Sequence, residues 1–301
     1  MQNSLAIIIL NYNNYKMTVE CVENLINHDI KDKIIVIDNK SRNESFNVLK
    51  NRFKYFNNVK VISSDYNNGY AYGNNFAVKL LVNENIKNIC IMNPDIIIND
   101  NNIFSDLIYL KEKYNLKGIT ATQILNNSYD MSTLGWKLPN FKDLIILNSN
   151  IISKIYNPIK YKSLKMISKK DLLAKIDVMP GCFFLIDKDF FEKIGFFDER
   201  TFLYYEENII SKKAKLNNGE FGVCLKSFYI HNHIEKDKSI SRLRNKINDR
   251  KIILYSQKIY AYNYLNINFL KKYILNISQN FNLYFELPII HILKFINRRL
   301  K

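Results

Sequence analysis

The chain has 301 residues, 47% of them hydrophobic, and carries 44 Lys and Arg against 28 Asp and Glu, a formal net charge of +16. Length and composition allow one large domain, or a domain with an appendage, around a sizeable core. The positive charge indicates an anionic partner. Charge alone leaves nucleic acid, an anionic membrane face and a phosphorylated substrate open.

Cysteine spacing and hydropathy narrow the class of protein. The four cysteines lie far apart and form no C-x-x-C pair: Cys21, Cys90, Cys182 and Cys224. This pattern favours buried, reduced thiols over a zinc site. Residues 5–10 are too short for a signal-peptide core, and no run reaches the roughly 18 apolar residues of a membrane span. We therefore expect a cytoplasmic protein that can touch the membrane peripherally from that side.

Strand and helix patterns alternate over the first hundred residues. The predicted strands are 5–10, 33–37, 59–62 and 89–92, and the predicted helices are 17–27, 43–56 and 76–81. This alternation is typical of βαβ units with a parallel sheet. Polar clusters follow the strands at 11–14, 38–41, 67–75 and 93–95. In a parallel sheet these clusters lie along one edge, where open α/β sheets bind ligands.

The stretch Asn93-Pro94-Asp95 follows the fourth predicted strand. Pro94 has no N–H, so the ladder should stop there and Asp95 should project from the strand end. A carboxylate in that place can hold a divalent cation against a diphosphate, although these residue types are also common in plain turns. The glycine-rich nucleotide-binding motifs G-x-G-x-x-G and G-x-x-x-x-G-K do not occur. Nucleotide binding would therefore depend on side chains such as Asp38. The alternative role of Asp38 is a helix cap.

The second half is less regular at first. Residues 125–176 are interpreted as an insertion or lid over the active edge, with disorder as the alternative. Further on, the pattern predicts helices at 188–194 and 209–216 and strands at 182–186, 222–225 and 228–230. From about residue 240 it is helical, basic and rich in Tyr and Phe, with eight Lys or Arg and one acid, Glu286, between 251 and the end. The last segment, 288–299, fits either an anionic membrane surface or ordinary packing on the domain.

Taken together, the motifs resemble those of family-2 inverting glycosyltransferases of the rhamnosyltransferase-like branch. The matching segments, from residue 7 to about 239, are 8–13, 36–41, 67–75, 92–95, 180–185, 195–199 and 202–207. The resemblance implies an α/β fold of the GT-A (nucleotide-diphospho-sugar transferase) type, with a mainly parallel central sheet and a C-terminal helical region. It implies a transferase domain at 1–239, made of a nucleotide-binding half (1–100) and an acceptor half (101–239), followed by a basic, aromatic helical region at 240–301.

The resemblance also implies where the ligands bind. The nucleotide-sugar donor would contact Asn11, Tyr12, Asn13, Asp38, Asn39, Asn67, Gly69, Asn75 and Asn93. Asp95 matches the direct metal ligand of the family's Asp-x-Asp, and His231 or His233 falls near a late histidine that completes the metal or diphosphate site. The implied cofactor is Mg²⁺ or Mn²⁺.

The catalytic residues implied are Glu207, Glu206 and Asp198. Glu207 takes the place of the family's general-base Asp with one extra methylene, and Asp198 lies in an element on the acceptor side. A further acid of the family is Ile209 here. Without the resemblance, Glu206 and Glu207 would be interpreted as helix N-terminal acids favoured by the helix dipole.

The resulting hypothesis is an inverting hexosyltransferase. It would move a sugar, with dTDP-L-rhamnose the first candidate donor and UDP-sugars the alternative, to a hydroxyl of a surface-glycan precursor such as O-antigen, capsule or lipooligosaccharide, free or lipid-linked. The alternative from another class is a catalytically inactive module that binds nucleotide sugar or glycan. No nucleic-acid motif accompanies the charge, so nucleic acid is not an expected partner.

Overall fold

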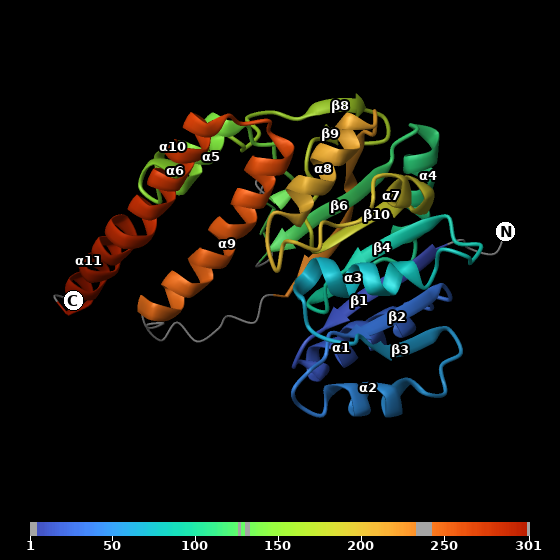
Figure 1. Cartoon of the computed structure of the whole chain (residues 1–301). Coiled ribbons are helices and arrows are strands. Elements are labelled where there is room, and N and C mark those ends of the chain that lie inside the picture. The colour runs from blue at the N-terminus through green and yellow to red at the C-terminus, as the bar shows by residue number, and fades with distance from the viewer. Residues whose placement is uncertain (1–4, 126–127, 130–132, 233–242, 300–301) are drawn as a thin grey trace.

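A computed structural model describes residues 5–125, 128–129, 133–232 and 243–299. One twisted sheet forms its centre, helices cover both faces, and a helical arm formed by the end of the chain stands at one side (Figure 1). The strands are β1 (Leu5–Asn11), β2 (Lys33–Asp38), β3 (Val59–Ser63), β4 (Asn88–Met92), β5 (Ile96–Ile98), β6 (Gly118–Leu125), β7 (Ser128–Tyr129), β8 (Lys165–Ser168), β9 (Leu173–Ile176), β10 (Phe183–Asp187) and β11 (Phe221–His231).

The described strands are hydrogen-bonded in the order β3-β2-β1-β4-β10-β6-β11-β9-β8, with β5 paired to β11 and β7 to β6. The first four strands of the chain are parallel, and β6 is parallel to β11. The carboxyl ends of β1, β2 and β4 therefore meet at one edge of the sheet, as predicted. β10 is antiparallel to both β4 and β6, so the sheet is mixed.

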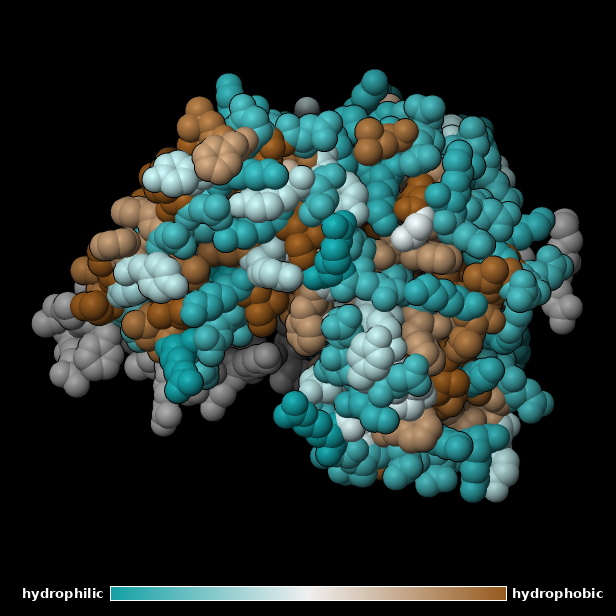
Figure 2. Space-filling model, viewed as in Figure 1, coloured by the Kyte–Doolittle hydropathy of each residue, from teal (hydrophilic) through white to brown (hydrophobic). Residues whose placement is uncertain are grey.

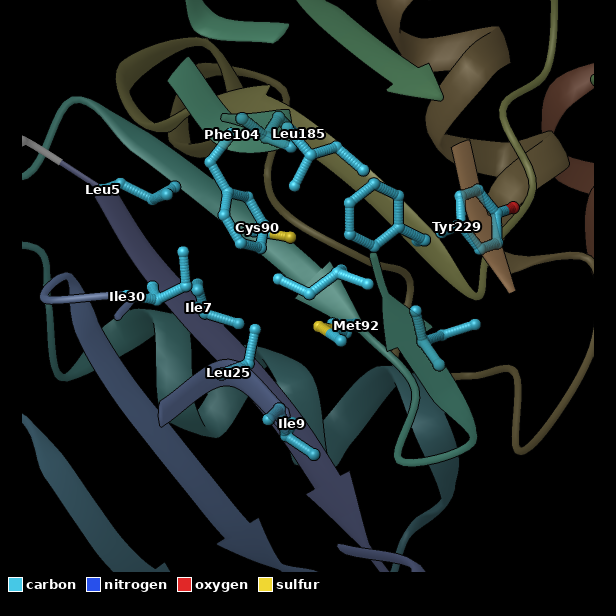
Figure 3. Close-up of a cluster of buried hydrophobic side chains, with 14 of the residues drawn as sticks. Leu5, Ile7, Ile9, Leu25, Ile30, Cys90, Met92, Phe104, Leu185 and Tyr229 are labelled. Atoms are coloured by element: carbon cyan, nitrogen blue, oxygen red, sulfur yellow. The ribbon is translucent and has the colours of Figure 1, made fainter. Parts of the chain in front are cut away.

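The helices before the C-terminal arm are α1 (Tyr15–Asn27), α2 (Ser45–Phe53), α3 (Gly69–Lys79), α4 (Ile103–Lys113), α5 (Phe141–Asn148), α6 (Ile152–Ile155), α7 (Lys188–Lys193) and α8 (Glu206–Leu216). Alternate residues of β1 enter two different cores because successive side chains of a strand point to opposite faces. Ile7 and Ile9 pack in a cluster with α1, α2 and α4 residues (Figure 3). Ile8 packs with α3, α7 and α8 residues on the other face.

Several predicted elements differ from the structure. α3 begins at Gly69, so residues 69–75, predicted as a loop, are helical. The predicted strands 222–225 and 228–230 are one strand, β11, interrupted by a register shift between Cys224 and Phe228. The segment 125–176 is not simply a lid. Its last part forms β8 and β9, which extend the edge of the sheet because β9 pairs with β11.

The C-terminal region is helical, as predicted. It consists of α9 (Leu243–Tyr264), then α10 (Phe269–Phe281), a π-helical segment η2 (Asn282–Glu286) and α11 (Leu287–Arg299), which form one continuous rod. A third cluster, which includes Leu144, Ile209, Tyr260 and Leu275, joins α5, α8, α9 and α10. Within the described residues, no helix has the length and apolar character needed to cross a membrane. All four cysteines are buried and free, as predicted.

Candidate active site

The ends of β1 and β2 are tied together by their last side chains. Asn11 and Asp38 are register partners, and the Asn11 Nδ2 donates to Asp38 Oδ2 at 2.8 Å. The Asn11 Oδ1 accepts from the Thr18 hydroxyl at 2.8 Å, and Asp38 Oδ1 accepts from the Ser41 N–H at 2.9 Å. Both side chains are buried, so these bonds fix the two strand ends before any ligand arrives.

The adjoining turns are also joined. The Asn13 N–H donates to the Ser41 hydroxyl at 2.8 Å, and Asn13 Oδ1 accepts from the Arg42 N–H at 2.8 Å. Asn13 has a φ of 56°, a conformation that asparagine tolerates better than most residues. Tyr12 is 41% exposed beside this turn and can meet a ligand from solvent.

The loop before α3 connects this edge to the second half of the chain. Asn39 Nδ2 donates to Asn67 Oδ1 and to the Gly69 carbonyl oxygen, both at 3.0 Å. Gly69 has a φ of +92°, and a Cβ placed there would lie 2.1 Å from the Phe202 carbonyl oxygen. Only glycine allows the loop to approach the 202–205 segment this closely.

Tyr70 connects the Asn-Pro-Asp turn to the segment that contains Gly181. Its hydroxyl lies 2.7 Å from the Gly181 carbonyl oxygen and 3.2 Å from Asn93 Oδ1 and, having one proton, donates to one of them at a time. Burial, followed by the negative charge of Glu206, raises the pKa of Tyr70 well above its ordinary value, so the hydroxyl stays a donor. The Asn93 N–H donates to the Cys182 carbonyl oxygen at 2.8 Å.

Asp95 pairs with His231 at the end of β11. His231 Nε2 lies 3.0 Å from Asp95 Oδ2, and the Asn232 N–H donates to the Asp95 carbonyl oxygen at 2.8 Å. Burial disfavours the imidazolium of His231, but the hydrogen bond to Asp95 outweighs burial and raises its pKa to about 10. A cavity of about 100 Å³ borders Asp95 on the α1 side. His233 lies outside the described residues.

Glu206 and Glu207 begin α8 after two residues with left-handed backbone, Tyr204 (φ 70°) and Tyr205 (φ 67°). Such strain in non-glycine residues clusters at functional sites. Burial raises the pKa of Glu207 to about 7, and burial together with the charge of Glu207 raises that of Glu206 further. The Oε2 atom of each carboxyl group is buried and has no hydrogen-bond partner among the described residues.

One short series of contacts brings the two halves of the site together. Glu207 Cδ lies 4.0 Å from the position that a Cβ on Gly181 would take. Gly181 contacts Tyr70, and Tyr70 contacts Asn93, two residues before Asp95. The acids of α8 thus lie on the same side of the molecule as the Asn-Pro-Asp turn. A carboxyl group that titrates near neutral pH beside such a turn is suited to acid-base chemistry.

Comparison with known proteins identifies the family. The family model described as "Glycosyl transferase family 2" matches residues 6–195. This chain is a family-2 glycosyltransferase. A curated relative from Haloferax volcanii, the low-salt glycan biosynthesis hexosyltransferase Agl10, is 25% identical over 272 residues, which are 87% of this chain and 78% of the relative.

Solved structures with the GT-A fold superpose over most of the glycosyltransferase. GalNAc-T7 with UDP, GalNAc and Mn²⁺ has a TM-score of 0.61 at 16% identity over 93% of this chain, which spans 55% of that protein's chain. The mannosyltransferase PcManGT from Pyrobaculum calidifontis, with GDP-Man and Mn²⁺, has a TM-score of 0.59 at 10% identity, covering 96% of this chain and 73% of its own. These similarities confirm the predicted GT-A-type α/β fold.

Two predicted site residues of the glycosyltransferase, Asn75 and Asp198, hydrogen-bond to residues that lie outside the strand ends. Asn75 donates to the Phe197 carbonyl oxygen at 3.0 Å and to Glu199 Oε1 at 2.9 Å, so its amide joins α3 to the 197–199 loop. Both oxygens of Asp198 accept from Arg200, and one also accepts from the Tyr264 hydroxyl at 2.8 Å. Although burial opposes it, Arg200 keeps the pKa of Asp198 below its ordinary value, which makes Asp198 a weaker base than Glu207.

Other residues of the site have contacts that sequence reasoning does not predict. Tyr70 and Gly181 lie inside matching motifs, but no periodicity or spacing shows that they touch. The Trp136 Nε1–H donates to Asn208 Oδ1 at 2.9 Å and so steadies α8 one residue after Glu207. Only the three-dimensional contact identifies this positioning role.

The residues present suit a divalent cation held jointly with a substrate. Within the described part of the chain, no group of three or more His, Cys, Asp or Glu side chains could hold a metal alone. Asp95 and His231 supply one carboxylate and one imidazole that already touch each other. Mg²⁺ and related ions are commonly held by one or two protein ligands, with substrate phosphates and water completing the coordination. The pair therefore fits such an ion once the His231 imidazolium gives up its proton, because only the neutral ring has a lone pair for a metal.

Proposed function

We propose that this glycosyltransferase moves a hexose, with inversion at the anomeric carbon, from a nucleoside diphosphate to a hydroxyl group of a surface-glycan precursor. The observation that carries the proposal is the contact series from Asn93 through Tyr70 and Gly181 to Glu207. It supports a donor site at the strand ends and a base across from it. The name of the Haloferax relative supports a hexose and a glycan product.

In this proposal Asn11, Asp38, Asn39 and Asn67 shape the part of the site that receives the nucleotide. Glu207 takes the proton of the acceptor hydroxyl as the acceptor oxygen bonds to the anomeric carbon. The bond from that carbon to the diphosphate breaks, and its electron pair leaves with the phosphate oxygen. A divalent cation held by Asp95 and His231 would stabilise the charge on the departing diphosphate.

The base assignment is tested with Glu207→Gln in the full-length protein. Removing a general base costs about 10²- to 10⁴-fold in rate, so we expect sugar transfer to fall by that factor while donor binding is retained. Glu112→Gln, at an exposed position on α4, is the matched control and should keep full activity. Unchanged transfer by Glu207→Gln contradicts the assignment.

The donor is identified by thermal shift with nucleoside diphosphates and nucleotide sugars, each with Mg²⁺ or Mn²⁺, because a ligand that binds the native state raises the apparent stability. We propose dTDP-L-rhamnose as the first donor to test, followed by UDP- and GDP-hexoses. Metal-dependent release of nucleoside diphosphate with any of them excludes an inactive binding module. A stabilising donor without turnover, across a panel of glycan acceptors, supports that module instead.

A further inference from the structure

The helical rod of α10, η2 and α11 buries polar side chains as well as Leu275 and Leu283. Three of the side chains that it buries against the rest of the protein are polar, namely Gln279, Asn282 and Glu286. Its outward side chains are large and apolar, at positions three or four residues apart: Leu270, Tyr273, Ile274, Ile277, Phe281, Tyr284, Phe285, Ile289, Ile292 and Leu293. We call this outward set the apolar stripe.

The rod is held in this orientation by its buried polar groups. The Glu286 carboxylate accepts from the Ser149 hydroxyl at 2.7 Å and from the N–H groups of Asn150 and Ile151 at 2.8 and 2.9 Å. Gln279 Nε2 donates to Gln257 Oε1 at 2.6 Å. Rotating the rod to bury the apolar stripe would break these bonds and leave a buried carboxylate without donors, which is strongly unfavourable. The stripe is therefore fixed facing outward.

The segment around α6, whose first backbone N–H groups bond to Glu286, adds further exposed apolar side chains. Ile151, Ile152, Ile155 and Tyr156, in and around α6, are 52–83% exposed. Figure 2 shows hydrophobic residues gathered over the C-terminal helices, at the left of the view. Contiguous exposed apolar surface of this kind marks an interaction site, since single exposed apolar residues are ordinary but long stripes are not.

The net positive charge of the C-terminal region favours a lipid surface over a second copy of the chain. Between residue 251 and the end there are eight Lys or Arg and one acid, Glu286, whose carboxylate is buried and fully used. Two copies meeting through this surface would bring like charges together, whereas anionic lipid headgroups would attract it. Tyr and Phe side chains on a helix of net positive charge, as in this rod, are typical of helices that lie in the interface of a bilayer.

We propose that the apolar stripe docks on an anionic lipid bilayer, with the rod lying in the plane of the interface. From Phe269 to Leu293 the rod is roughly 37 Å long at the helical rise per residue. The side chains of the stripe enter the boundary between headgroups and acyl chains, and the net positive charge of the C-terminal region attracts the anionic headgroups. The proposal rests on the rod alone and holds whichever sugar the glycosyltransferase moves.

The test is co-sedimentation of the full-length protein with vesicles of phosphatidylcholine containing phosphatidylglycerol. Phe281 and Phe285 stack on each other and are 56% and 60% exposed, so replacing both by Ser removes apolar contact without disturbing the core. We expect the Phe281→Ser/Phe285→Ser variant to bind at least about tenfold more weakly. Tyr55→Ser, at an 83% exposed aromatic outside the rod, is the matched control and should bind as the unaltered protein does.

A gain of signal provides a second measurement that does not depend on lost binding. The chain has one tryptophan, Trp136, which lies outside the stripe. Phe285→Trp should give a blue-shifted emission with anionic vesicles that the unaltered protein lacks, and added salt should reduce it. Failure to bind these vesicles, or a stable dimer in solution that Phe281→Ser/Phe285→Ser dissociates, would overturn the proposal.

Discussion

Glu206 and Glu207 are adjacent carboxyl groups in a buried setting that disfavours their charge. Burial raises the pKa of both, and the charge of Glu207 further raises that of Glu206. The N-terminal end of α8 stabilises negative charge there but does not cancel the effect of burial. A base with a pKa near neutral is strong enough to take a proton and still largely unprotonated when substrate arrives. The burial that raises the pKa of these carboxyl groups also destabilises the folded protein when they are ionised.

The rate of transfer should depend on pH through Glu207. With its pKa raised to about 7, Glu207 is protonated and inactive as a base at lower pH. We expect kcat to fall about tenfold per pH unit below that value, and Glu207→Asp, the family's residue, to keep this acidic limb at a shifted position. The measurement is a pH-rate profile at saturating donor. A rate that does not change between pH 5 and pH 8 argues against Glu207 as the base.

Stability should change with pH in the opposite sense. Because the folded pKa of Glu207 lies above its unfolded value, the stabilisation it contributes is complete below pH 4.5 and is lost as pH rises through about 7. Glu207→Gln removes this loss, so we expect the variant to gain about 1–3 kcal/mol over the unaltered protein between pH 5 and pH 8. Thermal unfolding without ligand measures the difference.

The exposed Glu112→Gln variant is again the control, and its difference from the unaltered protein should stay flat across this pH range. A Glu207→Gln difference that is equally flat would mean that Glu207 titrates as an ordinary surface carboxyl group.

At single positions, the sequence shows where strand-end residues lie more readily than where other polar residues lie. Asn11, Asp38 and Asn93 end strands of a parallel sheet, and that topology alone brings them to one edge. Asn75 and Asp198 have the same polar chemistry, but their partners are Phe197, Arg200 and Tyr264. Spacing along a chain does not show which of several neighbours a side chain will bond.

At the level of elements, the loop before α3 and the segment before α8 touch through Gly69. The Tyr70 N–H donates to the Phe202 carbonyl oxygen at 2.8 Å, and the open space at Gly69 permits that bond. The donor side of the site and the base side are therefore not independent loops. A change in one is transmitted to the other through a backbone contact.

Gly69→Ala should disturb both sides at once. The added Cβ would clash with Phe202 and strain a φ of +92°, so we expect a loss of about 2–4 kcal/mol in stability and weaker donor binding. Thermal unfolding and donor titration measure the two effects. Gly181→Ala is the matched control for stability, since a Cβ there would make only an ordinary contact at 4.0 Å. Equal stability of both variants would contradict the close approach.

Sequence predicts a helix or strand well where an apolar run is clearly bounded by polar or turn residues. It predicts poorly where contacts with distant parts of the chain determine the structure. β10 was found as a strand, but its antiparallel place between β4 and β6 has no signature in its own residues. β8 and β9 were absorbed into a predicted lid because they are short and hold Lys165 and Lys175. β8 lies at the edge of the sheet, and an edge strand needs few apolar residues, so its sequence resembles that of a loop.

At the scale of the molecule, the C-terminal helices share a core with the transferase domain. Leu275 of α10 is fully buried with Ile209 of α8, two residues after Glu207. The predicted boundary near residue 240 therefore marks a change in composition and not an independent unit of packing. We infer that the rod and the sheet unfold together.

Leu275→Ala should destabilise the whole protein. Truncating a buried Leu costs about 2–5 kcal/mol, so a single transition should move to lower temperature. Ile277→Ala, two residues away and 51% exposed, should leave that transition nearly unchanged. Calorimetry of the full chain gives the answer. Two separate transitions, of which only the smaller responds to Leu275→Ala, would show that the rod folds alone.

The period of a helix predicts an apolar face but not the direction in which it points. The residues after 268 have the spacing of an amphipathic helix, which is equally compatible with packing and with exposure. The orientation of the rod is determined by the hydrogen bonds of Gln279, Asn282 and Glu286. Their partners come from other parts of the chain: Gln257, Arg250 and Ser149. Buried polar pairs of this kind cannot be recognised before the fold is known.

The bond between Gln279 and Gln257 continues to the Tyr205 hydroxyl, at 2.9 Å from Gln257 Nε2, one residue before Glu206. The outward rod and the segment that leads into the acids of α8 are thus joined by one series of hydrogen bonds. An enzyme docked through that rod holds its reaction centre at a constant height above the lipid. It would then glycosylate hydroxyl groups within a narrow band of distance from their anchor.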